Sequence, residues 1–187
     1  SHRRRAGGCR ACGGGDPADS EHRPVSIAMN PHLSDTTLPE PLRPPLSRNV
    51  ALLLESRIPA RLAWTGAAGR PRVAAIWFHW DGTAVVMTTF SGAAKLEEID
   101  DRSVVAISID TDTFPYRSLR IGGPVTVAPC DGLSPEYRLA AARYLGEAAG
   151  EAWCRSLAGR SQVVIRLTPR WATEGDMSRS PFLADPA

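Results

Sequence analysis

The stretch "VVMTTFSGAAKLEEI", residues 85–99, places hydroxyl-bearing and small residues directly ahead of a basic side chain. Thr88, Thr89 and Ser91 supply the hydroxyl groups, and Lys95 supplies the cation. Hydroxyl and ammonium groups donate hydrogen bonds to phosphate oxygens, and small residues allow the backbone to approach a ligand closely. These residue types at this spacing indicate an anion site. The alternative is an ordinary solvated start of a helix.

An anion site of this kind needs a helix that begins near Gly92 or Ala93, so that Lys95 lies in its first turn. The backbone N–H groups at the start of a helix carry partial positive charge and favour an anion there. A cation at the same end is mildly unfavourable for the helix, and a bound phosphate would reverse that penalty. We therefore expect a strand that ends near Phe90, followed by a helix.

Several other kinds of site are excluded by motif. The sequence has no G-x-x-x-x-G-K-[ST] phosphate loop and no G-x-S-x-G nucleophile elbow. Cys9 and Cys12 form a C-x-x-C among Gly and Arg residues, without the second ligand pair that zinc needs. His79 alternates with large apolar residues, which is typical of a structural or interface residue. We predict no metal site, although the "EEIDD" stretch, a solvated helix end by its composition, could hold a divalent ion weakly.

Composition indicates a soluble globular protein. A chain of 187 residues is long enough for one domain, and its hydrophobic fraction of 43% and charged fraction of 22% are ordinary for such proteins. The formal charge of +2 is too small to indicate nucleic-acid binding. No apolar run approaches the roughly 20 residues that span a bilayer, and no signal-peptide core is evident. We expect a cytoplasmic protein that binds neither nucleic acid nor membranes.

The predicted domain organisation is a tail, one folded domain and a short second tail. Residues 1–45 are rich in Gly, Pro, Arg and Ser and are predicted to be a disordered tail followed by a Pro-rich linker. Within this tail, Met29 is a candidate for the true initiator. The folded domain is predicted over residues 46–178, and residues 179–187 form the C-terminal tail.

The chain predicts a mainly β (α+β) fold. Ser47 can cap a first helix, and Ser134 followed by Pro135 marks a second that Gly150 breaks or bends. Asp81-Gly82 between two apolar runs is a strong hairpin signal. Six strands are predicted at residues 61–66, 72–80, 83–90, 103–110, 118–128 and 161–169. Because hairpins dominate and βαβ alternation is absent, we expect an antiparallel barrel with peripheral helices rather than a Rossmann sheet.

One predicted strand, "RVAAIWFHW", is apolar on both faces. Val73 and Trp77 fall on one side, and Ile76 and Phe78 fall on the other. A small barrel needs only its inward face to be apolar, so the second face needs a helix, a ligand or another subunit to cover it. The small size of the barrel favours a second subunit, and we expect a dimer.

The order of these motifs resembles the FMN-binding split-barrel family related to pyridoxamine 5′-phosphate oxidase. The similarity is carried by "GRPRVAAIWFHWDGTAVVMTTFSGAAKLEEIDDRSVVAISIDTD", with its W-F pair, its Asp-Gly hairpin, its Thr-Thr strand end and its lysine. The later "YRSLRIGGPVTV" is similar to the Arg- and Gly-bearing strand of the family. The resemblance covers Ser47 to about Met177.

The resemblance implies a six-stranded antiparallel Greek-key split barrel, homodimeric, with FMN at the subunit interface. By position it places one strand along the flavin, partly through backbone groups, the threonines by the ribityl chain or phosphate, and the serine–lysine segment on the phosphate. Arg117 and Ser118 would come from the second subunit. The implied cofactor residues are Arg72, Val73, Ala74, Ala75, Ile76, Trp77, Thr88, Thr89, Ser91, Ala94, Lys95, Arg117 and Ser118.

The sequence also departs from the family's pattern. Ala94 stands where the family often has an arginine before the lysine, which removes one phosphate ligand. Ala75 stands where a proline is usual. The C-terminal Arg-rich segment that grips the substrate in true pyridoxamine phosphate oxidases is not evident, so oxidation of pyridoxamine phosphate is not expected.

The function that follows from the resemblance is an FMN-dependent oxidoreductase acting on a small-molecule substrate. The flavin would transfer the hydride or electrons, and no side chain stands out as a catalytic base. Two alternatives stay open: a deazaflavin-dependent reductase of the same fold, and a non-catalytic dimer that binds flavin or haem.

Overall fold

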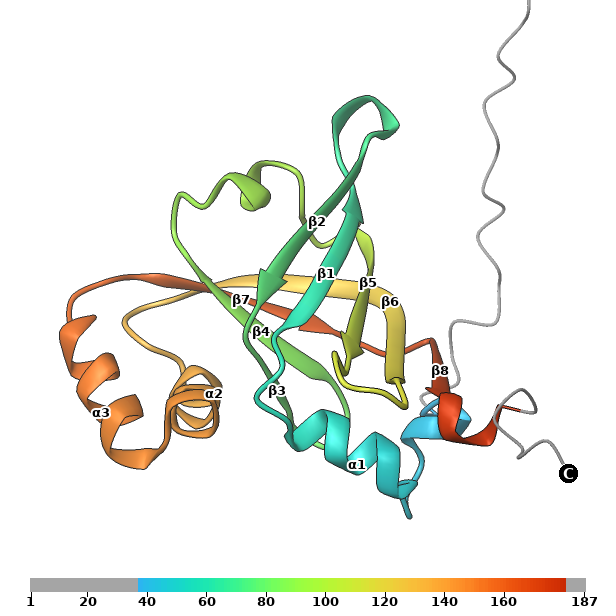
Figure 1. Cartoon of the computed structure of the whole chain (residues 1–187). Coiled ribbons are helices and arrows are strands. Elements are labelled where there is room, and N and C mark those ends of the chain that lie inside the picture. The colour runs from blue at the N-terminus through green and yellow to red at the C-terminus, as the bar shows by residue number, and fades with distance from the viewer. Residues whose placement is uncertain (1–36, 181–187) are drawn as a thin grey trace, which may run out of the picture. The chain divides into compact units, whose positions relative to one another are not determined.

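The computed structural model describes residues 37–180 of the chain (Figure 1). The predictions made for Cys9, Cys12 and Met29, and for most of the C-terminal tail, lie outside these residues. The three α-helices are α1 (Arg48–Glu55), α2 (Pro135–Leu145) and α3 (Glu147–Ser156). Short 3₁₀ turns are η1 (Glu40–Leu42), η2 (Ala67–Gly69), η3 (Ala94–Glu97) and η4 (Met177–Arg179).

The described residues are mainly β. The strands are β1 (Ala60–Thr65), β2 (Pro71–Ile76), β3 (Phe78–Trp80), β4 (Val85–Phe90), β5 (Val104–Asp110), β6 (Arg117–Cys130), β7 (Gln162–Leu167) and β8 (Trp171–Asp176). The prediction of six strands is wrong for this part of the chain, which forms eight. One predicted strand divides at Trp77 into β2 and β3, and β8 forms in a polar segment that carries no alternating apolar pattern.

All strand pairs are antiparallel, and the sheet follows the order β2-β1-β5-β6-β7-β4-β3, with β8 paired to β6. The two strands at the ends of this path, β2 and β3, are consecutive in the chain, with Trp77 alone between them. The chain itself therefore joins the two ends of the sheet. Side chains that face inward from both halves form one core, in which Leu62, Ile107, Ile121 and Ile165 are almost fully buried.

The fold begins upstream of the predicted boundary at residue 46. Leu42 in η1 is fully buried in the core, although the sequence assigned residues 37–45 to the linker. A Pro-rich segment has little apolar periodicity, so a single anchoring leucine gives no sequence signal. Burial of that one side chain, together with contacts between η1 and β8, fixes this segment to the sheet.

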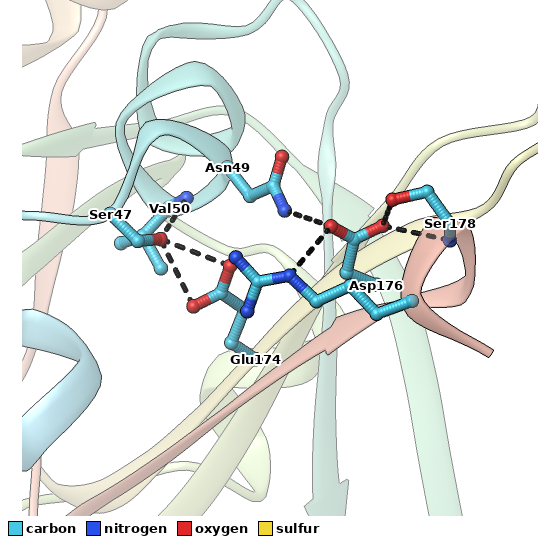
Figure 2. Close-up of polar contacts among 7 residues, drawn as sticks. Ser47, Asn49, Val50, Glu174, Asp176 and Ser178 are labelled. Carbon is cyan, nitrogen blue, oxygen red and sulfur yellow. Dashed lines mark hydrogen bonds and ion pairs between the residues drawn. The ribbon is translucent and has the colours of Figure 1, made fainter. Parts of the chain in front are cut away.

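The first helix is tied to the last strand by polar side chains (Figure 2). The Ser47 hydroxyl accepts a hydrogen bond from the Val50 N–H at 3.2 Å, which confirms its predicted role as a cap. The same hydroxyl lies 3.0 Å from both carboxylate oxygens of Glu174 on β8. Asn49 Nδ2 donates to Asp176 at 2.6 Å, and Asp176 also accepts from the backbone and hydroxyl of Ser178. These contacts explain why a polar segment completes the sheet.

The helical hairpin of α2 and α3 bends at Gly146 rather than at Gly150. Gly146 has φ of 89°, a left-handed conformation that favours glycine, and it ends α2. Gly150 lies inside α3, where a Cβ atom would come within 2.7 Å of the Ala141 backbone. Gly150 is therefore needed for the close approach of the two helices and not for the bend.

Candidate functional site

A pocket of about 440 Å³ lies between the β1–β2 hairpin and the turn η3. Four of the expected cofactor residues share it: Arg72, Ala74, Ala94 and Lys95. Its remaining lining residues are Trp64, Glu97 and Glu98. The hairpin and the η3 segment are separate in the sequence, and residues of both line the pocket. The structure therefore brings the two halves of the predicted site together.

Lys95, the only lysine in the sequence, lies in the wall of this pocket. Its ammonium group donates one hydrogen bond, to Thr89 Oγ1 at 3.2 Å. Among residues 37–180 no carboxylate forms an ion pair with it, so two of its three N–H groups have no protein partner there. These groups are available to an anion in the pocket.

The predicted helix around Lys95 is wrong. The segment forms only η3, a four-residue 3₁₀ turn preceded by Ala93 in extended conformation without a side-chain cap. So short a turn has no aligned stack of peptide dipoles, which reduces its attraction for an anion. The positive charge in the pocket wall therefore comes from side chains and not from a helix terminus.

Glu98 connects the two walls, although the composition of its segment predicts a solvated helix end. Its carboxylate accepts hydrogen bonds from Trp64 Nε1 at 2.9 Å and from the Ala67 N–H at 3.2 Å. It also lies 3.4 Å from Arg72 Nε, forming an ion pair. The hydrogen bond from Trp64, followed by that from Ala67, holds the pKa of Glu98 below its usual value. At neutral pH this carboxylate is ionised.

The role of Glu98 leaves one trace in the sequence, the glycine at position 66. This glycine can be connected with Glu98 only once the fold is known. A Cβ atom at position 66 would lie 2.7 Å from both carboxylate oxygens of Glu98. Glycine at this position leaves space for the carboxylate to reach the hairpin. The contact spans more than thirty residues of sequence, and the packing of η3 against the hairpin decides it.

The expected flavin-binding strand is divided among three environments. Arg72 and Ala74 face the pocket, whereas Val73 is 66% exposed on the opposite face of the sheet and Ala75 is also exposed. Ile76 is buried in the core. Successive side chains of a strand point to opposite faces of the sheet. A ligand on one face can therefore contact only every second side chain of β2, or its backbone. β2 lies at one end of the strand order and pairs with β1, as its predicted backbone role requires.

Trp77 packs against α2 and does not line the pocket. Its ring stacks on that of Tyr144, with centroids 4.9 Å apart and planes 7° apart, and lies 6.0 Å from the ring of Tyr137. Burial raises the pKa values of both tyrosines, so their hydroxyls stay protonated at neutral pH. This stack covers part of the second apolar face with a helix, one of the three covers that the sequence left open.

The remaining expected residues lie in different places. Thr88 is buried on the face of β4 opposite to Thr89, and Ser91 is exposed. Arg117 and Ser118 begin β6, opposite Asp176 and Gly175 of β8, and they do not line the pocket. Within one chain, therefore, the two groups of expected cofactor residues are separate.

Several solved structures have a fold similar to that of this chain. A conserved hypothetical protein from Mycobacterium tuberculosis is 18% identical, with a TM-score of 0.55 over 71% of this chain and 86% of that one. An F420 reductase is 27% identical, with a TM-score of 0.50 over 65% of this chain and 93% of that one. A protein from Clostridium acetobutylicum, related to general stress protein 26 of the pyridoxinephosphate oxidase family, is 14% identical. Its TM-score is 0.47, over 67% of this chain and 84% of that one.

The resemblance to the pyridoxamine 5′-phosphate oxidase-like split barrels is confirmed. Structures similar to this chain include proteins of that family and FAD- and F420-binding proteins. No family model and no curated protein matches the sequence. The low identities mean that the likeness is one of fold, and the site must be argued from this chain's own residues.

The outer face of the sheet carries a row of small and apolar residues that lie opposite one another on neighbouring strands. Ala63 lies opposite both Val73 and Ala106, and Gly122 lies opposite Ala106 and Trp171. The Trp171 side chain covers Gly122 and is 44% exposed. A pocket of about 290 Å³ on this face is lined mainly by Ala63, Val73, Ala106 and Trp171, with Arg61, Ser108 and Arg120 beside them. Val73, which the sequence placed on the second apolar face of its strand, belongs to this surface, whereas Trp77 of the same predicted face is covered by α2.

No three His, Cys, Asp or Glu side chains among residues 37–180 are grouped so that they could hold a metal ion. None of the helices in these residues is long and apolar enough to cross a membrane.

Proposed function

We propose that this protein is an oxidoreductase that uses a flavin-type cofactor, FMN or a deazaflavin, and holds the cofactor's phosphate at Lys95. The observation that carries the proposal is the Lys95 ammonium, fixed by Thr89 in a pocket wall with no carboxylate partner in the described residues. When bound, such a cofactor supplies hydride or electron transfer. The chain supplies binding and orientation.

The pocket fits the phosphate end of such a cofactor. Ala74 and Ala94 have small side chains that leave room for a ligand, and Trp64 adds an aromatic surface. The Lys95 ammonium group has N–H donors without a protein partner among the described residues. Arg72 also lines the pocket, so two cationic side chains are present there. The flavin ring would extend from this pocket along β2, whose position at the end of the sheet supports contact through its backbone.

A specific observation favours a deazaflavin as the second candidate. The pocket's four charged side chains are two cations and two carboxylates, and Arg72 is already paired with Glu98. A phosphate monoester such as that of FMN carries about −1.5 to −2 charges at pH 7, whereas a phosphodiester has a single ionisable oxygen and carries one. The solved structure that is 27% identical to this chain is an F420 reductase, which supports a deazaflavin as the second candidate.

The proposal includes a homodimer in which a second copy covers the outer face of the sheet. This face has small and apolar residues at its centre, with Val73 and Val104 both about two-thirds exposed, and Arg61 and Arg120 border them. Exposed apolar surface of this extent on a small domain marks an interaction site. Arg117 and Ser118 are remote from the Lys95 pocket within one chain, so their expected role at the cofactor would require the second copy.

The test is direct binding to purified full-length protein. FMN, F420, riboflavin and haem are titrated separately and followed by flavin or deazaflavin fluorescence, or by the Soret band. We expect micromolar or tighter binding of FMN or F420, and weaker binding of riboflavin, which lacks a phosphate. Binding of haem alone, or of none of the four, would contradict the proposal. A reductase screen of bound protein with several acceptors then addresses the substrate.

A further inference from the structure

We propose that Glu98 is the specificity-determining residue of the phosphate pocket and makes it select a phosphate with one negative charge over one with two. The inference rests on the proposed function, because it concerns the same pocket. It goes further by assigning the selectivity to one carboxylate and by naming the phosphodiester as the preferred group.

Glu98 acts by occupying Arg72. The carboxylate lies 3.4 Å from Arg72 Nε and 3.5 Å from Arg72 Nη2, so it faces two of the guanidinium donors. Its side chain is 18% exposed, and that of Arg72 is 44% exposed. An arginine engaged in this way has fewer donors for an anion. Lys95 is then the one pocket cation that has no carboxylate partner in the described residues.

Glu98 is fixed in place and cannot easily turn away to release Arg72. Trp64 Nε1 and the Ala67 N–H both donate to its carboxylate, and Gly66 leaves just enough space for it. A ligand that recruited Arg72 would have to compete with Glu98 and would bring negative charge next to a fixed carboxylate. The unfavourable interaction grows with ligand charge, so it is larger for a dianion than for a monoanion.

Glu97 offers a matched control in the same pocket. It lines the pocket as Glu98 does and carries the same charge, but it is exposed and has no hydrogen bond or ion pair among residues 37–180. Glu97→Gln therefore removes one negative charge from the pocket without releasing Arg72. Glu98→Gln removes the same charge and releases Arg72, while the amide oxygen keeps an acceptor for Trp64.

The experiment compares FMN with its phosphate monomethyl ester, which carries one negative charge fewer on the phosphate and one additional methyl group. Dissociation constants are measured by flavin fluorescence for the wild-type protein, Glu98→Gln and Glu97→Gln, with thermal unfolding as a check on folding. We expect Glu98→Gln to tighten FMN binding about tenfold and ester binding about threefold. If FMN binding to wild type is too weak to measure, we expect it to become measurable in Glu98→Gln. Glu97→Gln should change FMN binding by less than about threefold.

A second variant tests whether Arg72 is the group released. In the double variant Glu98→Gln/Arg72→Gln, most of the gain in FMN affinity should disappear, because the freed guanidinium is absent. If the gain persists, Glu98 does not act through Arg72 and the proposal is wrong. If Glu98→Gln and Glu97→Gln change FMN binding equally, the proposal is also wrong, while the proposed function stands.

The wild-type protein gives an independent answer should Glu98→Gln fail to fold. It should bind the methyl ester at least as tightly as FMN, and a preference for FMN of more than about threefold would overturn the proposal. If wild type and variants bind neither flavin, and F420 is not bound either, the proposed function itself has failed. The two failures are therefore distinguishable.

Discussion

The guanidinium carbon of Arg143 lies 4.4 Å from the ring centroid of Phe78, a fully buried residue of β3. The same guanidinium donates hydrogen bonds to the backbone carbonyls of Phe78 and of Leu54 in α1. One side chain of α2 therefore joins a helix and an edge strand that are far apart in sequence. Burial lowers the pKa of Arg143, yet an arginine keeps its charge at any ordinary pH.

Replacing Arg143 with methionine should destabilise the fold. Arg143→Met leaves the Leu54 and Phe78 carbonyls without this donor, and we expect a loss of about 2–3 kcal/mol in the free energy of unfolding. Urea unfolding followed by tryptophan fluorescence measures it. Arg138→Met, an exposed arginine on the same helix, should change the value by less than about 0.5 kcal/mol. Equal effects of both substitutions would contradict the structural role of Arg143.

Stability should fall as the pH is lowered below about 6.5, the ordinary pKa of histidine, and His79 should be one cause. Burial, followed by the charge of Arg143, lowers the pKa of His79, while Asp81 and Glu136 oppose this shift. Below pH 6.5 the unfolded chain therefore binds a proton more readily than the folded one, which favours unfolding. Above that pH both states are neutral and the penalty is absent.

The measurement for His79 is the free energy of unfolding between pH 5 and pH 8. His79→Gln should flatten the decline of wild type below pH 6.5 without altering the slope above it. His79 is the only histidine among residues 37–180, which simplifies the comparison. Identical pH profiles for the two proteins would show that His79 has the same pKa in both states.

Two adjacent glycines of β6 should differ sharply in their tolerance of alanine. At Gly123 a Cβ atom would lie 2.0 Å from the backbone oxygen of Thr168, which cannot move without distorting the neighbouring chain. At Gly122 it would meet the ring of Trp171, an exposed side chain that can rotate. We expect Gly123→Ala to cost about 2–4 kcal/mol and Gly122→Ala about 1 kcal/mol, measured by chemical denaturation. The reverse order would contradict this packing.

Lys95→Ala should weaken binding of FMN or F420 at least tenfold, because a charge-assisted hydrogen bond to phosphate is lost. Riboflavin, which has no phosphate, should bind equally to both proteins, and isothermal titration separates the two cases. Arg70→Ala removes an exposed cation beside the same hairpin and serves as the control. An FMN affinity unchanged within about twofold would remove Lys95 from the phosphate site.

The proposed dimer is tested by placing a charge in the outer face of the sheet. We expect wild type to sediment with twice the chain mass of 20.1 kDa and Ala106→Glu to sediment as a monomer. The larger, charged side chain would separate two closely packed copies and would lose its hydration at the interface, which is unfavourable. Leu139→Glu, at an exposed position of α2, should leave the dimer intact. A monomeric wild type, or a dimer that tolerates Ala106→Glu, would contradict this interface.

The parts of the fold that depend on interactions between neighbouring residues could be predicted from the sequence. Ser47 and Ser134 cap their helices through backbone N–H groups three residues on, as predicted. Asp81-Gly82 forms the hairpin turn between β3 and β4, with Asp81 Oδ1 accepting from the Thr83 and Ala84 N–H groups. These interactions join residues that are neighbours in sequence, so residue type alone determines them.

Contacts between distant segments decided the rest. Strand β8 is polar, and it becomes a strand because β6 offers it a free edge and α1 holds its carboxylates. The sequence identified Lys95, Arg72 and the departure at Ala94, and the structure placed all three in one pocket. The pairing of Arg72 with Glu98 depends on how η3 packs against the hairpin. An ion pair forms only when two side chains are close in space, and the order of residues in the sequence does not give their distance.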